Sequence, residues 1–246
     1  MSMVRLTRTA MGQAMTTSID RDHAALYRLM TWLSPSYPIG GYSYSHGIEW
    51  AVEAGTINDA ATAQGWISSL MEYGGGYGDA VLLSVAYDAA AAGDRDALID
   101  VAELAGALPP SAELALETTA QGDAFMKITC AAWRCSGLDM LRNEWDGPVA
   151  LPVALGAAAA GHAIAKTATL TCYLHAFAAN LMSAALRTIP LGQTDGQRIM
   201  AALEPIIHAS ARRAQGETLC SFGTASLRAD IASMTHETQQ TRLFRS

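Results

Sequence analysis

The sequence has few charged and few aromatic residues. Of its 246 residues, 16% are charged and 7% are aromatic, whereas half are hydrophobic, and the formal net charge is -7. A protein whose main partner is nucleic acid needs a basic surface to meet the phosphates, so this charge argues against such a partner. The four cysteines form no CxxC pair, and no signal peptide precedes them. We therefore expect reduced thiols in a cytoplasmic protein.

Charge is absent altogether from two long stretches, 147–165 and 167–186, which only Lys166 separates. Each stretch is long enough to suggest a membrane span. Both, however, are built mainly on Ala, Gly and Thr, and they contain residues such as Pro152 and Asn180. Alanine gains little free energy from transfer into lipid. We therefore expect two buried helices of a bundle and no membrane-spanning segment.

Alanine fills much of the chain, and no segment alternates between apolar and polar residues for long. Alanine is the best helix former and a poor strand former. We therefore predict an all-α fold with a single bundle-like domain of about nine or ten helices over residues 23–214. A disordered leader (1–22) and a flexible tail (215–246) would flank it. The expected helices are 23–33, 47–54, 59–73, 79–92, 94–108, 111–135, the two uncharged stretches and 194–214.

Several local signals set these boundaries. Asn58 or Asp59 can cap one helix and Ser111 another, and Gly55 is well placed to end a helix. The TDGQ sequence at 194–197 matches a capping box. The glycine-rich run at 74–78 indicates a flexible break before the next helix.

Motifs for catalysis are missing. The glycines at 40–41 and 74–76 match neither GxxxxGK[ST] nor a GxGxxG between strand and helix. His236 and Glu237 begin an HExxH zinc motif, but Gln240 stands where the second histidine is needed. No Ser/His/Asp order and no pair of carboxylates stands out. We predict no catalytic residues and no metal site.

The end of the chain is unusually apolar for a terminus. Leu243 and Phe244 lie between Arg242 and Arg245. Aromatic residues and arginine carry much of the binding energy at protein interfaces. Two interpretations stay open: the segment docks on a partner, or it folds back on its own bundle.

The rest of the tail, from residue 215, is rich in Ser, Thr and charge. We predict that it is poorly ordered before a partner binds. Leu227, Ile231 and Met234 nevertheless recur at helical spacing. They would form one face of a helix on a partner's surface.

Three segments carry a family resemblance. They are PIGGYSYSHGIEWAVEAG at 38–55, RTIPLGQTDGQ at 187–197 and IASMTHETQQTRLFRS at 231–246. In this order they resemble urease accessory protein F. The similarity is close over residues 27–59, 177–207 and the last seventeen residues.

The resemblance implies an all-α homodimer without enzymatic activity or a tightly bound cofactor. Members of this family join urease accessory protein D (also called H) and the GTPase urease accessory protein G on the urease apoprotein. The complex uses GTP hydrolysis to help insert nickel into urease. Nickel is thus handled by the complex as a whole.

The resemblance also implies partner contacts. Arg187 matches a basic residue linked to control of the GTPase, and the family's tail docks on protein D/H. His46, Thr235 and Gln240 depart from the family's frequent residues, which puts the strength of partner binding in question. The expected partner-binding residues are Tyr42, Glu49, Arg187, Gln193, His236, Glu237, Arg242, Leu243, Phe244 and Arg245.

A second hypothesis comes from a different functional class. The chain could be a nickel carrier that passes the metal on directly through ligands such as His236 or Cys220. Nickel titration of the isolated protein separates a carrier from an assembly chaperone.

Overall fold

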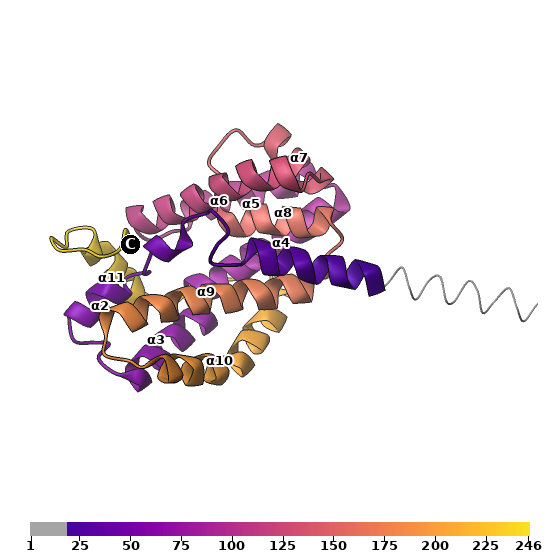
Figure 1. Cartoon of the computed structure of the whole chain (residues 1–246). Coiled ribbons are helices and arrows are strands. Elements are labelled where there is room, and N and C mark those ends of the chain that lie inside the picture. The colour runs from indigo at the N-terminus through magenta and orange to yellow at the C-terminus, as the bar shows by residue number, and fades with distance from the viewer. Residues whose placement is uncertain (1–18) are drawn as a thin grey trace, which may run out of the picture.

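The computed structural model describes residues 19–246, and within that range the chain is helical without any strand. The all-α prediction is confirmed. Residues 19–32 form a helix that projects from the body (Figure 1). The predicted leader lies mostly outside the described residues, but its last part, 19–22, is already helical. The elements that follow are η1 (Gly41–Ser43), α2 (Ile48–Glu53), α3 (Ala60–Glu72), α4 (Gly75–Ala92), α5 (Arg95–Ala107), α6 (Ala112–Ala132), α7 (Ser136–Glu144), α8 (Leu151–Gly161), α9 (Lys166–Thr188), α10 (Gln193–Ala214) and α11 (Leu227–His236).

The core is built around α8, which packs along α4 in the middle of the bundle (Figure 1). Eight consecutive residues of α8, from Pro152 to Ala159, are buried. Gly156 allows the close approach, since a Cβ there would lie 2.5 Å from the carbonyl oxygen of Leu83 on α4. The two uncharged stretches are therefore bundle helices, as predicted. Over residues 19–246, no helix combines the length and apolar character needed to cross a bilayer.

Several predicted boundaries are confirmed by cap geometry. The Asp59 carboxylate accepts a hydrogen bond from the Thr62 N–H at 2.8 Å, and the Thr62 side chain completes a capping box at α3. The Ser111 hydroxyl accepts from the Leu114 N–H at 3.2 Å at the start of α6. Gly55 follows α2 with φ +72°, a conformation that glycine adopts without strain.

Two predictions about where a helix begins are wrong. The run at 74–78 is not a break, because α4 begins at Gly75. The glycines instead allow close packing: a Cβ on Gly76 would lie 2.5 Å from the Met71 side chain. The predicted capping box at 194–197 is absent, because α10 already begins at Gln193, with Gly192 as N-cap and no side-chain cap.

The structure also contains a helix that the sequence interpretation missed, α7. Its N-cap residue, Cys135, makes no side-chain cap hydrogen bond, so no start signal was visible. Leu138 and Leu141 are buried and anchor α7 to the core. Tertiary burial, rather than a local signal, accounts for this element.

The tail is packed against the bundle. Helix α11 lies against α2 and α6, and Phe244 and Ser246 are buried. Of the two interpretations of the chain end, the structure shows the one in which it folds back on its own domain. The tail was predicted to be poorly ordered before a partner binds; in the structure, polar contacts hold this segment, which has few apolar residues of its own.

Candidate functional site

The loop before α2 is a tight turn on which α11 rests. Gly40 and Gly47 have φ values of +77° and +75°. A Cβ on Gly47 would lie 2.8 Å from the backbone nitrogen of Ser233, so only glycine lets α11 come this close. Of the two tyrosines, Tyr42 is 65% exposed, whereas Tyr44 is buried.

The end of the chain runs beside this loop. The Arg245 N–H donates to the Ser43 carbonyl at 2.8 Å, and the Ser45 N–H donates to the Ser246 main-chain oxygen at 2.8 Å. The Ser45 hydroxyl donates to the same Ser246 oxygen. Loop and tail therefore hold each other in place through the backbone.

Glu49, the second residue of α2, receives the tail. Its carboxylate accepts from the Leu243 N–H at 2.6 Å and from the Phe244 N–H at 3.0 Å. The same carboxylate lies 3.1 Å from Nε2 of His236. Glu49 is buried, so these contacts replace the water that a carboxylate would otherwise bind.

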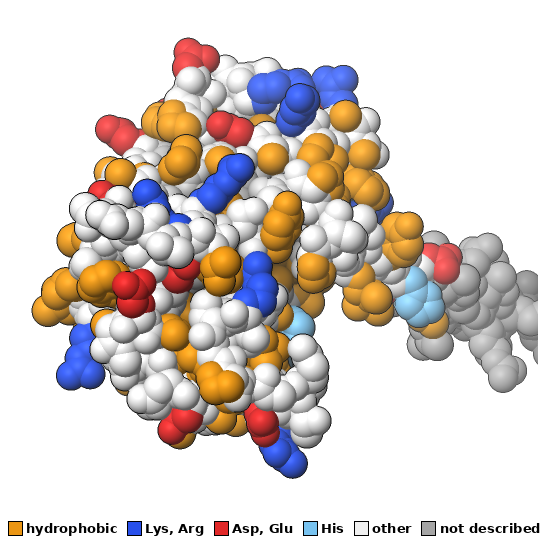
Figure 2. Space-filling model, turned by 60° about the vertical axis from the view of Figure 1, so that its left-hand side comes forward, with side chains coloured by type: hydrophobic (Ala, Val, Ile, Leu, Met, Phe, Trp, Pro, Cys, Tyr) orange, Lys and Arg blue, Asp and Glu red, His pale blue; other side chains and the backbone are white. Residues whose placement is uncertain are grey.

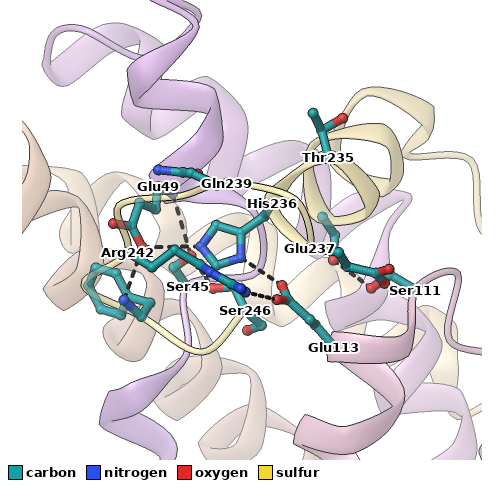
Figure 3. Close-up of polar contacts among 12 residues, drawn as sticks. Ser45, Glu49, Ser111, Glu113, Thr235, His236, Glu237, Gln239, Arg242 and Ser246 are labelled. Atoms are coloured by element: carbon teal, nitrogen blue, oxygen red, sulfur yellow. Dashed lines mark hydrogen bonds and ion pairs between the residues drawn. The ribbon is translucent and has the colours of Figure 1, made fainter.

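His236 lies between two carboxylates (Figure 3). Its Nδ1 is 2.6 Å from Glu113 at the start of α6, and its Nε2 faces Glu49. The side chain is fully buried. Each ring nitrogen of His236 thus faces a carboxylate oxygen of a different helix. Arg242 adds a guanidinium, with its Nη1 2.6 Å from Glu113. We call Glu49, Glu113, His236 and Arg242 the tail seat.

Glu237 serves the neighbouring helix. Its carboxylate accepts a hydrogen bond from the Ala112 N–H at 2.7 Å, at the start of α6. A negative charge is favourable at a helix N-terminus, where N–H groups lack helical partners. The hydroxyls of Ser111 and Ser233 lie 2.6 Å apart beside it. The His-Glu pair thus joins α11 to α6.

Arg187 joins the tail to α9 and the loop. Its guanidinium lies 4.2 Å from the centre of the Phe244 ring and donates to the Tyr42 carbonyl at 2.9 Å. Its Nε donates to the Ser183 carbonyl near the end of α9. Partial burial lowers the pKa of the Arg187 guanidinium. Arg187 therefore links α9, the loop and the tail, in addition to placing a favourable charge at the end of a helix.

Most of the predicted site residues gather in this one region. Gln193 does not: it is exposed at the start of α10 and makes no hydrogen bond to the tail among the described residues. Leu243 is 72% exposed, and Arg245 is exposed as well. The sequence interpretation missed Ser45 and Glu113, because an acid in the first turn of a helix is common and a serine in a loop carries no signal.

The outer side of α11 is apolar. Leu227, Ile231 and Met234 are 70%, 51% and 47% exposed. The helix that their spacing predicted is confirmed, since α11 contains all three. We call these three residues the α11 face. Figure 2 turns the tail side of the molecule forward and shows hydrophobic side chains among charged ones at the surface.

Metal ligands do not cluster in the described part of the chain, where no group of three or more His, Cys, Asp or Glu could hold an ion. Cys220 is exposed. Both nitrogens of His236 face carboxylate oxygens, so neither is directed at an open site.

Comparison with known proteins supplies the family. A model of the UreF family matches residues 57–204. A urease accessory protein UreF of Bradyrhizobium sp. strain BTAi1 is 54% identical over 227 residues, covering 92% of this chain and 94% of the relative. One of Rhodopseudomonas palustris strain HaA2 is 53% identical over 223 residues, covering 91% and 94%. The resemblance seen in the three motifs thus extends over most of the sequence, and the chain belongs to the UreF family of urease accessory proteins.

Proposed function

We propose that this protein is a non-enzymatic assembly chaperone that acts in the cytoplasm to mature urease. It would bring accessory protein D/H and the GTPase accessory protein G together on the urease apoprotein, so that nickel can be inserted. Membership of the UreF family supports the role in urease maturation. One observation supports the docking role: buried polar contacts hold the inner side of the tail, and its outer side exposes the apolar side chains of the α11 face and Leu243.

The α11 face and Leu243 would contact protein D/H. A surface that is already in its bound shape loses less conformational entropy on binding than a disordered tail. The tail seat supplies that order, because it fixes the backbone of residues 243 and 244 on Glu49. The docking element would therefore be a preformed surface.

Arg187 would influence the GTPase from the same region. Its contacts with Tyr42 and Phe244 place it between the loop and the tail. A partner that holds the tail would thus also fix Arg187. Control of the GTPase would depend on this connection.

A homodimer is the proposed assembly of the chain itself. The projecting helix of residues 19–32 exposes Leu26, Tyr27 and Met30 to 54%, 67% and 67%. Apolar groups this exposed on one helix are typical of a surface that another chain covers. Light scattering tests this: the wild type should have the mass of a dimer at micromolar concentration.

Copurification with proteins D/H and G tests the docking role. Leu243→Asp should weaken capture of D/H about thirtyfold, corresponding to about 2 kcal/mol, because it places a charge where an anchor would be buried. Leu116→Asp is the control for placing a charge at an exposed leucine outside the tail segment, since Leu116 is 60% exposed on α6. Equal capture by wild type and Leu243→Asp would show that the tail is not the docking element.

Deleting residues 242–246 is a poorer test. The deletion removes the Arg242–Glu113 ion pair and two of the donors to Glu49. It therefore damages the fold and the proposed interface together. The alternative function, a nickel carrier, gains no support from His236, and titration with Ni²⁺ tests it: tight stoichiometric binding by the isolated chain would favour the carrier.

A further inference from the structure

A second group of ionisable residues lies at the loop, outside the tail seat; Glu117 and Tyr173 are buried, and His46 and Asp79 are half-buried. Nε2 of His46 is 2.9 Å from the Glu117 carboxylate on α6. The same carboxylate accepts from Gln121 Nε2 at 3.1 Å and from the Ser246 hydroxyl at 2.7 Å. Glu117 thus connects the loop, α6 and the chain end.

The group borders a cavity of about 370 Å³, which His46, Asp79, Glu117 and Tyr173 help to line. The Tyr173 hydroxyl donates to the Asp79 carboxylate at 2.6 Å. The His46 ring packs edge-on against Phe177 at 4.7 Å between ring centres. Four elements therefore meet here: the loop, α4, α6 and α9.

Burial changes how these groups bind protons. It raises the pKa of Asp79 to about 6, although the Tyr173 hydrogen bond opposes the change. Burial lowers the pKa of His46, but the charge and the hydrogen bond of Glu117 outweigh it, so the pKa of His46 is raised. Burial and the nearby Asp79 carboxylate also raise the pKa of Tyr173 well above its usual value.

Other ionisable groups border the loop or the cavity. His175 of α9 and Asp230 of α11 line the same cavity. The tail seat contributes Glu49, Glu113, His236 and Arg242 on the other side of the loop. Of all these groups, only His46, Asp79, Glu117 and Tyr173 are joined in pairs under the loop.

We propose that His46, Asp79, Glu117 and Tyr173 form a proton-dependent latch, which fastens the loop and the chain end to the core more tightly at pH 5.5 than at pH 8. The chain end follows the loop because Ser45 bonds Ser246 and Ser43 bonds Arg245. When His46 loses its proton, Glu117 loses its only cationic partner in the group.

The direction in which the stability of the closed latch changes with pH follows from the number of protons that each state binds. In the closed state Asp79 and His46 hold protons to a higher pH than they would when exposed to water. The closed state therefore binds more protons, and its stability falls as pH rises through the pKa values of the closed state. For a tail that docks a partner as proposed above, the affinity would fall with it, but the latch itself does not depend on that function.

Hydrogen–deuterium exchange on the full chain tests the latch. After correction for the intrinsic exchange rate, the opening constant of peptides covering residues 40–47 and 243–246 should be at least about fivefold larger at pH 8 than at pH 5.5. The double variant His46→Gln/Asp79→Asn removes both titrations and keeps hydrogen-bonding groups, so its ratio should be close to one. Circular dichroism at both pH values checks that the variant is folded.

His208→Gln is the matched control, because His208 is an exposed histidine on α10 that lies 3.8 Å from Glu204. It should keep the wild-type ratio. A wild-type ratio below about twofold, or a double variant with the full wild-type ratio, would overturn the proposal. If the double variant does not fold, the single variants His46→Gln and Asp79→Asn replace it. Each should then have a lower ratio of opening constants between pH 8 and pH 5.5 than the wild type, and an unchanged ratio would overturn the proposal.

Discussion

Replacing His236 by alanine tests whether the tail seat holds the tail. The substitution removes a fully buried imidazole from between Glu49 and Glu113. Two carboxylates then face the space it leaves. Leaving a buried polar group without its hydrogen-bond partner costs about 1–3 kcal/mol, and more for a charged group such as a carboxylate. Arg242 still pairs with Glu113, and two backbone N–H groups still reach Glu49, so we expect a loss of about 3 kcal/mol.

The loss should appear first as local opening of the tail. A terminal segment can detach without unfolding the bundle, so its stability is separate from that of α4 and α8. About 3 kcal/mol corresponds to an increase of roughly a hundredfold in the opening constant. Hydrogen exchange of the peptides that cover residues 239–246 measures this constant directly. The peptides of α8 serve as an internal reference and should change little.

His208→Ala is the control for losing a histidine. Its side chain is 47% exposed, and exposed substitutions usually change stability by less than about 0.5 kcal/mol. His236→Gln should lie between the wild type and His236→Ala, because an amide can donate to one carboxylate but not to both. If His236→Ala exchanges its tail no faster than His208→Ala, the reasoning about the seat is refuted.

Three further predictions follow from the same contacts. Asp79→Asn should stabilise the fold at pH 8 by at most about 3 kcal/mol and have little effect at pH 4. The reason is that the native protein loses stability as pH rises from the ordinary pKa of an aspartate to the raised value of about 6, and the asparagine does not titrate; urea unfolding at both pH values measures the difference. Gly47→Ala should destabilise by about 2 kcal/mol more than Gly55→Ala in thermal unfolding, because both glycines have positive φ but only Gly47 is in close contact with another backbone. Arg187→Ala should cost about 2 kcal/mol, more than a helix-end charge would, and Arg187→Lys should recover part of it; equal unfolding curves for wild type and Arg187→Ala would contradict the contacts with Tyr42 and Phe244.

Local sequence signals explain which parts of the fold could be predicted. The start of a helix can be predicted where a capping residue precedes it, as at Asp59 and Ser111. Helix α7 begins without one, and the glycines at 74–78 act through packing rather than through flexibility. Both errors have the same cause, since burial against distant segments decided the local structure.

The candidate site also contains residues that sequence signals identify and residues that only the fold brings together. The residues Arg242 to Arg245 could be singled out from composition, because apolar side chains between arginines are unusual at a chain end. Of their partners, Glu49 was expected only from the family resemblance, and Glu113 was not expected. Glu49 and Glu113 are far from the tail in sequence, and each is an ordinary acid in the first turn of a helix. Only the fold brings them to His236.

The buried contacts also change what a tail of this kind can do. Glu49 binds the backbone of residues 243 and 244, so it fixes the position of the tail without using their side chains. Phe244 then turns inward to Arg187, whereas Leu243 is left exposed. A change at the exposed side chain can therefore alter partner binding alone, while a change at a buried contact must alter the fold as well. This separation is what allows the docking proposal and the stability of the tail to be tested independently.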